Sequence, residues 1–144
     1  MATHTASDWK ASNFGGESSA FTDLQHARDL REGANYTAAL QHYRRAWEAS
    51  PPDCSIAHDA FLEAGMVLGF MGEFEGSLEA LRETVRRWPT SAAAYLNFGK
   101  TLLMLGEYDD ARPVLTQAVA LAPYGSCIND EASKQLDLLR QFGH

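Results

Sequence analysis

The sequence predicts an all-α fold built from antiparallel helix pairs. From about Ala20 onward, apolar residues recur at spacings of three and four, the period of a helix with one buried face. The alternation typical of a half-buried strand is absent, and so are Asn-Gly and Asp-Gly hairpin turns. The turn residues recur at a fixed interval, because Gly72 and Gly106 are 34 residues apart. The same interval separates Pro89 from Pro123, so helix–turn–helix units repeat along the chain.

The length and the charge of the chain exclude several classes of function. The chain has 144 residues, 45% hydrophobic and 22% charged, which suits one folded domain. Its net charge is −7, whereas binding to phosphates needs a basic face, so we expect no nucleic-acid partner. No apolar run approaches the roughly 20 residues of a membrane span, and residues 1–11 lack the features of a signal peptide. We therefore expect no membrane insertion, and a cytoplasmic location.

The turn residues also divide the chain into elements. Residues 1–17 are rich in Ser, Thr, Gly and Asn and predict a flexible N-terminal tail. Residues 18–144 form the helical domain. Its repeats are expected at about 20–53, 58–91 and 92–125. From 126 to 142, apolar residues at helical spacing oppose a charged side, which predicts a capping helix with Gly143 as its stop.

Three segments share one residue pattern, in which large and small residues alternate at fixed places before a proline. The third segment reads Tyr95, Phe98, Gly99, Leu102, Gly106, Glu107, Tyr108, Ala111, Leu115, Ala118 and Pro123. The second reads Phe61, Ala64, Gly65, Leu68, Gly72, Glu73, Phe74, Ser77, Leu81, Thr84 and Pro89. The first, which is looser, reads Asp23, His26, Ala27, Leu30, Ala34, Asn35, Tyr36, Ala39, Tyr43, Ala46 and Pro51.

This pattern resembles the tetratricopeptide repeat family over about 105 residues. The resemblance implies a right-handed superhelix of three antiparallel helix pairs followed by the capping helix. Asp23 and His26 depart from the pattern and suggest a first repeat with one solvent-facing side. The first and second prolines are 38 residues apart, so the second repeat begins with a longer loop or an extra helical turn.

Small and large residues take complementary roles in stacked helix pairs. Gly65 and Gly99 are expected to let the first helix of a repeat approach its neighbour, while Leu81 and Leu115 fill the layer between repeats. Thr90 or Ser91 is expected to cap the next helix. Pro113 is expected about one turn into its helix, where it costs little.

The resemblance also implies a binding surface, since the first helices of such repeats line a concave groove. The predicted groove residues are Leu24, Arg28, Arg31, Leu62, Met66, Phe70, Leu96, Asn97, Lys100, Leu103 and Met104. They combine an apolar floor with basic edges, which favours an amphipathic or apolar segment of a partner protein. One subclass of the family binds acidic chaperone tails through Lys, Asn and Arg. Here the corresponding places hold Leu24, Arg28, Glu63, Ala93 and Asn97, so we expect no binding of such tails.

No catalytic residue, cofactor or metal is expected. The glycines form no phosphate loop, and no His-Glu-x-x-His motif occurs. His26 and His42 fall on different helices of the first repeat, and we interpret them as a chance pair rather than a zinc site. Cys54, with His58 four residues later, is interpreted as a half-buried loop thiol and not as an activated nucleophile.

The predicted function is therefore protein–protein interaction without catalysis, as an adaptor, assembly factor or small chaperone. Three alternatives stay open. The groove could hold the chain's own tail through Trp9 and Phe14. The protein could resemble the type III secretion chaperones that hold hydrophobic clients. It could also self-associate as a structural scaffold subunit.

Overall fold

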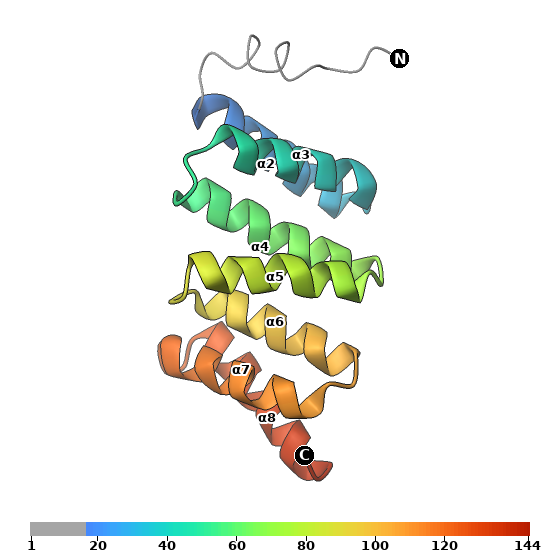
Figure 1. The fold of residues 1–144 in the computed structure, drawn as a ribbon, viewed down its shortest axis with the longest axis vertical. Coiled ribbons are helices and arrows are strands. Elements are labelled where there is room, and N and C mark those ends of the chain that lie inside the picture. Colours follow the sequence, from blue (N-terminus) through green and yellow to red (C-terminus); the bar gives the residue numbers. More distant parts are fainter. Residues whose placement is uncertain (1–16) are drawn as a thin grey trace. The chain divides into compact units, whose positions relative to one another are not determined.

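A computed structural model describes residues 17–144, which form seven α-helices and contain no strand (Figure 1). The helices are α2 (Glu17–Glu32), α3 (Tyr36–Ala49), α4 (Ser55–Phe70), α5 (Phe74–Arg87), α6 (Ala92–Met104), α7 (Tyr108–Leu121) and α8 (Cys127–Gln141). The all-α prediction is confirmed. The predicted tail lies outside the described residues, except for Glu17, which begins α2. Within the described part of the chain, no helix is both long and apolar enough to span a bilayer.

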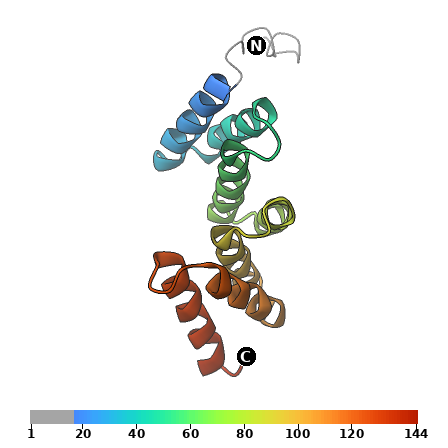
Figure 2. The same cartoon turned by 90° about the vertical axis from the view of Figure 1, so that its left-hand side faces the viewer.

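The chain divides into two compact units, and the division falls inside α4. The N-terminal unit ends at Ala60 and contains α2, α3 and the start of α4. Here α2 packs along α3, as Figure 2 shows. Ala27 of α2 and both Ala39 and Tyr43 of α3 are fully buried. Small alanines let two helices approach closely, while a large buried side chain such as that of Tyr43 fills the remaining space.

The C-terminal unit, Phe61–His144, holds the rest of α4 and the helices α5 to α8. From α5 onward each helix packs on the next, and α8 lies against both α6 and α7. A Cβ atom built on Gly65 would lie 2.8 Å from Leu81 Cγ, and one on Gly99 would lie 2.5 Å from Leu115 Cδ2. Both leucines are fully buried. The predicted close approach at the two glycines is therefore seen, but the leucines that meet them fill space within a helix pair, whereas we had expected them between repeats.

Buried hydroxyl groups join three helices of this unit. Ser77 Oγ on α5 donates to Gly65 O on α4 at 2.8 Å and lies 3.2 Å from Thr101 Oγ1 on α6. Thr101 in turn donates to Asn97 O at 3.0 Å. Each hydroxyl has a partner, so the core tolerates these polar groups.

The ends of the helices follow the predicted signals, with one correction. Ser91 Oγ accepts from Ala94 N at 3.2 Å and caps α6, as expected. Gly143, with φ 82°, follows the end of α8. The extra residues of the second repeat add a helical turn, because α4 starts at Ser55 and has 16 residues where α6 has 13. Pro113 is the sixth residue of α7, which starts at Tyr108, so it lies beyond the first turn and removes a backbone donor there.

The turn between α2 and α3 carries a strained alanine. Ala34 has φ 60°, whereas the matching turns of the other two pairs have glycine there, Gly72 at 80° and Gly106 at 78°. The left-handed conformation costs a residue with a Cβ about 1–2 kcal/mol, and glycine raises unfolded-state entropy by about 0.4–1 kcal/mol. We expect Ala34→Gly to stabilise the protein by about 0.5–1 kcal/mol in urea denaturation. Gly106→Ala should destabilise the protein, because it places a Cβ at a positive φ. Destabilisation by Ala34→Gly would contradict the interpretation that Ala34 is strained.

A partly exposed carboxylate on α5 gives the protein a pH dependence. Glu83 accepts hydrogen bonds from Arg86 at 2.9 Å and from Arg87 at 2.7 Å. These bonds lower the pKa of Glu83 to about 2. Because the folded pKa is depressed, the stabilisation is present above the ordinary pKa of 4.5 and is lost as the pH falls through about 2. We expect Glu83→Gln to lower the urea midpoint slightly at pH 6, and the difference in midpoint between the variant and wild type to shrink toward pH 2. A difference in midpoint that stays constant with pH would show that the charge of Glu83 does not stabilise the fold.

Candidate functional site

The three leucines predicted as the groove floor are buried. Leu24 is 2% exposed, and Leu62 and Leu96 are each 8% exposed. Leu62 packs with Leu81 and Ala94, while Leu96 belongs to the core that α6 forms with α7 and α8. Their side chains hold helices together, so a partner would meet other residues. The family resemblance supplied these positions, but it does not show how deeply the next helix covers each of them.

Five of the predicted residues instead line one open pocket in the C-terminal unit. The pocket has a volume of about 250 Å³ and lies between α4, α5 and α6. The predicted residues on its wall are Met66, Phe70, Asn97, Lys100 and Met104. The wall is completed by Gly65, Gly69, Phe74, Leu81 and Thr101. Sequence analysis missed Phe74, although its place at the start of the second helix of the pair is visible in the repeat pattern.

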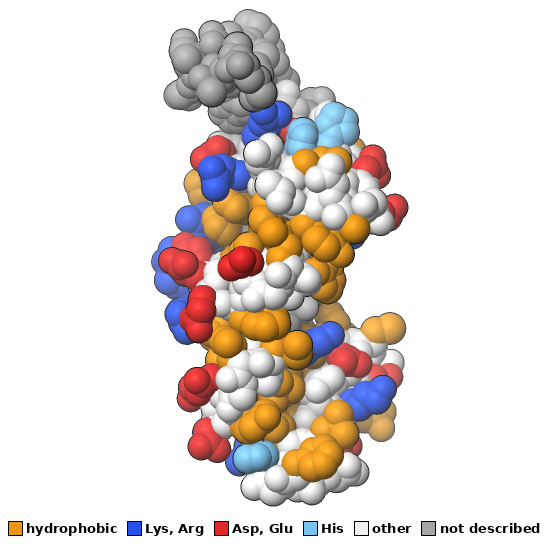
Figure 3. Space-filling view, turned by 90° about the vertical axis from the view of Figure 1, so that its right-hand side faces the viewer, with side chains coloured by type: hydrophobic (Ala, Val, Ile, Leu, Met, Phe, Trp, Pro, Cys, Tyr) orange, Lys and Arg blue, Asp and Glu red, His pale blue; other side chains and the backbone are white. Residues whose placement is uncertain are grey.

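The accessible part of this pocket is mainly apolar. Phe70 is 58% exposed and Met104 is 66% exposed, and each is near the C-terminal end of its helix. Hydrophobic side chains reach the surface in the space-filling view of Figure 3. Gly65 and Gly69 carry no side chain that would fill the space between α4 and its neighbours. The absence of side chains at these two places helps to keep the pocket open.

Polar groups border the pocket on the α6 side. Lys100 Nζ lies 3.8 Å from Glu131 Oε1 of α8, and both side chains are partly exposed. An exposed pair at this distance contributes little to stability, so the ammonium group can exchange its partner. Asn97 Nδ2 donates to Ala93 O at 2.8 Å, which fixes the carboxamide along its own helix. The pocket therefore offers one cation and one oriented amide beside an apolar floor.

Leu103 lines a different hollow, which α6, α7 and α8 form together. This second hollow has a volume of about 390 Å³ and includes Tyr108, Leu138 and Phe142. The ring of His144 lies 4.4 Å from that of Tyr108. Leu103 therefore does not contribute to the pocket that holds the other five residues.

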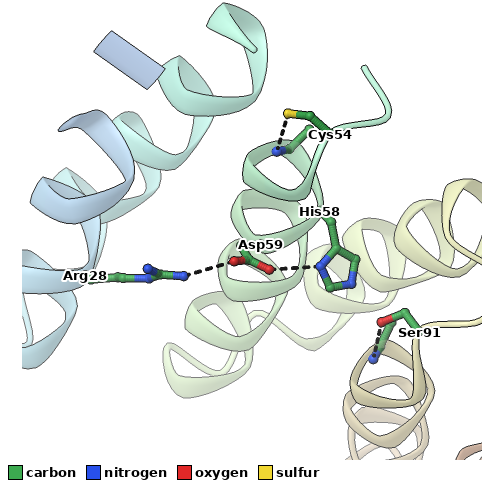
Figure 4. A network of polar contacts seen from close by, with 7 residues as sticks. Arg28, Cys54, His58, Asp59 and Ser91 are labelled. Atoms are coloured by element: carbon green, nitrogen blue, oxygen red, sulfur yellow. Dashed lines mark hydrogen bonds and ion pairs between the residues drawn. The ribbon is translucent and has the colours of Figure 1, made fainter. Parts of the chain in front are cut away.

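The two predicted arginines belong to the N-terminal unit. Arg28 Nη2 lies 3.2 Å from Asp59 Oδ2, and His58 Nδ1 lies 2.9 Å from the other oxygen of the same carboxylate (Figure 4). The hydrogen bond from His58, followed by the charges of His58 and Arg28, lowers the pKa of Asp59. Arg31 is half-buried in the last turn of α2. Arg28, which was predicted as part of the basic edge of the groove, is thus already paired with the carboxylate of Asp59 on α4.

The geometry around Cys54 agrees with a structural thiol. Its Sγ accepts a hydrogen bond from Ala57 N at 3.4 Å, at the beginning of α4 (Figure 4). The side chain of His58 meets Asp59 through Nδ1, so the carboxylate and not the thiol holds that nitrogen. The thiol acts as a helix cap, which is consistent with the interpretation of Cys54 as a half-buried loop residue.

The structure brings together three potential metal ligands, and adds Asp23 to the two histidines that sequence analysis had considered as a pair. Asp23 and His26 of α2 and His42 of α3 each offer one ligand atom, and these atoms lie within 4.8 Å of one another. His42 Nδ1 is 2.9 Å from Asp23 Oδ1, and the two imidazole rings meet edge to face at 5.4 Å. Sequence analysis had noted Asp23 only as a departure from the repeat pattern, and had interpreted His26 and His42 as a chance pair rather than a zinc site. Their distance from His42 depends on the α2–α3 pairing.

Comparisons with known proteins agree with this architecture. The sequence profile of the tetratricopeptide repeat matches residues 62–126. The structure is similar to the Arabidopsis OM64 TPR domain, with a TM-score of 0.74, 15% identity, and coverage of 88% of this chain and 98% of that one. It is also similar to the first TPR of Spaghetti (RPAP3), solved with the HSP90 peptide SRMEEVD, with a TM-score of 0.78 and 16% identity. That match covers 88% of this chain and 96% of the other.

A third similar structure is that of MamA. The TM-score is 0.71 at 22% identity, and the match covers 86% of this chain and 63% of MamA. No curated protein matches the sequence closely enough to count as a relative. At these identities the solved structures support the fold alone.

Proposed function

Because the chain belongs to the tetratricopeptide repeat family, we propose that it is a non-catalytic protein-interaction module that binds an apolar or amphipathic segment of a partner protein. The observation that carries this proposal is the open pocket between α4, α5 and α6, with Phe70 and Met104 more than half exposed beside it. Exposed apolar groups around a concave site are typical of surfaces that a partner covers. Methionine adapts to different side-chain shapes, which suits recognition of a segment with a variable sequence.

The dimensions of the pocket favour one or two inserted side chains and not a whole helix. A volume of about 250 Å³ is slightly below the range of about 300–1,000 Å³ typical of small-molecule sites. Anchor residues such as Leu, Met or Phe would fill it, while the rest of the segment lies along the surface. Lys100 at the border favours an acidic residue next to the anchor, which would replace Glu131 as its partner.

Residues outside this pocket argue against acidic chaperone tails as the ligand. Two similar structures are solved with tail peptides, the first TPR of Spaghetti with an HSP90 peptide and the second TPR of human RPAP3 with an HSP70 peptide. In this chain the places that the family uses for the carboxylate include Leu24, which is buried and apolar, and Glu63, which is negative. We expect no measurable binding of a peptide ending in EEVD at concentrations up to the millimolar range.

An adaptor, assembly factor or small chaperone in the cytoplasm fits this type of site. The net charge of −7 argues against nucleic acid as the ligand, because phosphate contacts need a basic surface. A second candidate is self-association through the hollow around Leu103, where Leu138 and Phe142 are exposed. Light scattering over a concentration series distinguishes the two, because only self-association raises the mass with protein concentration.

We expect the double variant Phe70→Ser, Met104→Ser to lose partner binding while it stays folded. Both side chains are more than half exposed, so their removal takes apolar contact area from the partner and little from the core. Anchor residues of an interface each contribute about 2 kcal/mol or more, so the double variant should bind at least 100-fold more weakly. The measurement is a pull-down from native lysate with mass spectrometry, followed by titration of the recovered partner.

The matched control is Tyr124→Ser, which removes a large side chain that is 98% exposed and does not line the pocket. Circular dichroism and a urea denaturation curve verify that all three proteins are equally folded. A partner that binds wild type and Tyr124→Ser but not the double variant supports the pocket. Equal binding of the partner by all three proteins would exclude the pocket as the binding site.

A further inference from the structure

We propose that Asp23, His26 and His42 form a binding site for a divalent late transition-metal ion, with Zn²⁺ as the reference ion. This inference is independent of the pocket between α4, α5 and α6, because all three residues belong to the N-terminal unit. Asp23 and His26 are three residues apart on α2, so they share one face of that helix. His42 projects toward the same place from α3, which packs along α2.

The distances suit a metal after rotation of side chains alone. Ligands held at about 2.0–2.1 Å in a tetrahedral site are about 3.3 Å from one another. His42 Nδ1 and Asp23 Oδ1 are already 2.9 Å apart. The ligand atoms of all three residues lie within 4.8 Å of one another, so the third ligand needs to move by at most about 1.5 Å. Rotations about side-chain bonds achieve such a shift without movement of the helices.

The surroundings leave room for an ion with open coordination positions. The three residues line a hollow of about 340 Å³ that Ser19, Thr22 and Arg45 complete. The side chains of Asp23 and His42 are only 16% and 23% exposed, whereas His26 is exposed. Histidine surfaces beside an acidic group are visible over the N-terminal helices in Figure 3. Three protein ligands and a position open to solvent are typical of zinc sites that bind water or an external ligand.

The place of these residues in the repeat gives an independent argument. Asp23 occupies the position that Phe61 and Tyr95 hold in the other two repeats, and His26 corresponds to Ala64 and Phe98. In the C-terminal unit, the corresponding Phe98 packs on the core. The first repeat thus replaces an aromatic and an apolar residue by two metal-ligand types. Imidazole and carboxylate together suit Zn²⁺, Co²⁺ and Ni²⁺ better than Mg²⁺ or Ca²⁺, which prefer oxygen ligands.

Arg45 allows a test of the charge at this site. It lines the same hollow, so its positive charge opposes the binding of a cation. Replacement by glutamine keeps a side chain of similar length and removes the charge. We therefore expect Arg45→Gln to bind Zn²⁺ more tightly than wild type, whereas loss of any ligand weakens binding.

The experiment is calorimetric titration of the full chain with Zn²⁺, with Mg²⁺ as the reference for nonspecific charge. We expect one Zn²⁺ per chain in wild type and no saturable binding of Mg²⁺. His26→Gln and Asp23→Asn should each weaken Zn²⁺ binding by at least about 10-fold, because even loss of an outer-shell partner has an effect of 10- to 100-fold. His58→Gln is the matched control, since it removes another imidazole that is paired with an aspartate.

A second readout does not depend on affinity. Addition of paramagnetic Co²⁺ should selectively shift or broaden the imidazole NMR signals of His26 and His42, and leave that of His58 unchanged. The proposal is overturned if wild type binds no stoichiometric Zn²⁺, if the two ligand variants bind as tightly as wild type, or if Co²⁺ acts on His58 instead. The helical content of each variant is measured as well. When it is unchanged, weaker Zn²⁺ binding results from loss of the ligand and not from unfolding.

Discussion

Leu115→Ala is expected to destabilise the protein by about 3–4 kcal/mol, the middle of the range for leucine truncations in a packed core. Leu115 of α7 is fully buried and lies in the core that α6, α7 and α8 share. Its side chain sits against the backbone of Gly99 on α6. Truncation removes three carbon atoms and leaves a cavity that two rigid helices cannot close. Urea denaturation monitored by circular dichroism measures the change.

Gly99→Ala tests the same contact from the other helix. The new Cβ would lie 2.5 Å from Leu115 Cδ2 and 2.6 Å from its Cγ, closer than carbon atoms approach in folded proteins. Overpacking of this kind costs about 1–3 kcal/mol, while alanine in a helix regains about 1 kcal/mol relative to glycine. The net expectation is a destabilisation of about 1 kcal/mol.

The double variant gives the decisive measurement. In Gly99→Ala, Leu115→Ala the added methyl group occupies space that the truncated leucine has vacated, so both the clash and part of the cavity disappear. We expect the double variant to be more stable than the sum of the two single changes predicts, by about 1–2 kcal/mol, within the range for residues in contact. Strict additivity would show that the two helices do not approach as closely as the structure has them.

Asn129→Ala is expected to destabilise the protein by about 2 kcal/mol, because it removes two buried hydrogen bonds at once. Asn129 of α8 is almost fully buried, and its Nδ2 donates to Val119 O at 3.1 Å and to Ala122 O at 3.3 Å. Both acceptors are at the C-terminal end of α7, where the last carbonyls have no donor within their own helix. The side chain therefore fastens α8 to the helix before it.

The matched control is Asn97→Ala, since Asn97 is also an asparagine within a helix but donates only to Ala93 O of its own helix. We expect a change of less than about 1 kcal/mol for that control. Hydrogen exchange gives a second readout, because loss of the Asn129 contacts should speed exchange in α8 more than in α6. Equal effects of the two alanine variants would show that Asn129 does not fasten the capping helix.

The sequence by itself determined the class of the fold and some of the signals at the ends of helices. These features depend on local rules: apolar spacing, the 34-residue interval, the serine before α6 and the glycine after α8. The close approach at Gly65 was also predicted from the repeat pattern, but its contact with Leu81 of the same helix pair was not. Pro113 was misplaced, since α7 starts at Tyr108 and the proline is its sixth residue, beyond the first turn.

Only the tertiary structure decided which side chains on the predicted face a partner can reach. Leu62, Phe70 and Leu96 belong to the same predicted surface, yet Phe70 is exposed and the two leucines are buried. Exposure depends on how closely the neighbouring helix approaches, and that distance results from packing over many residues distant in the sequence. The grouping of Asp23 and His26 with His42 has the same origin, because the pairing of α2 with α3 places residues from two helices side by side.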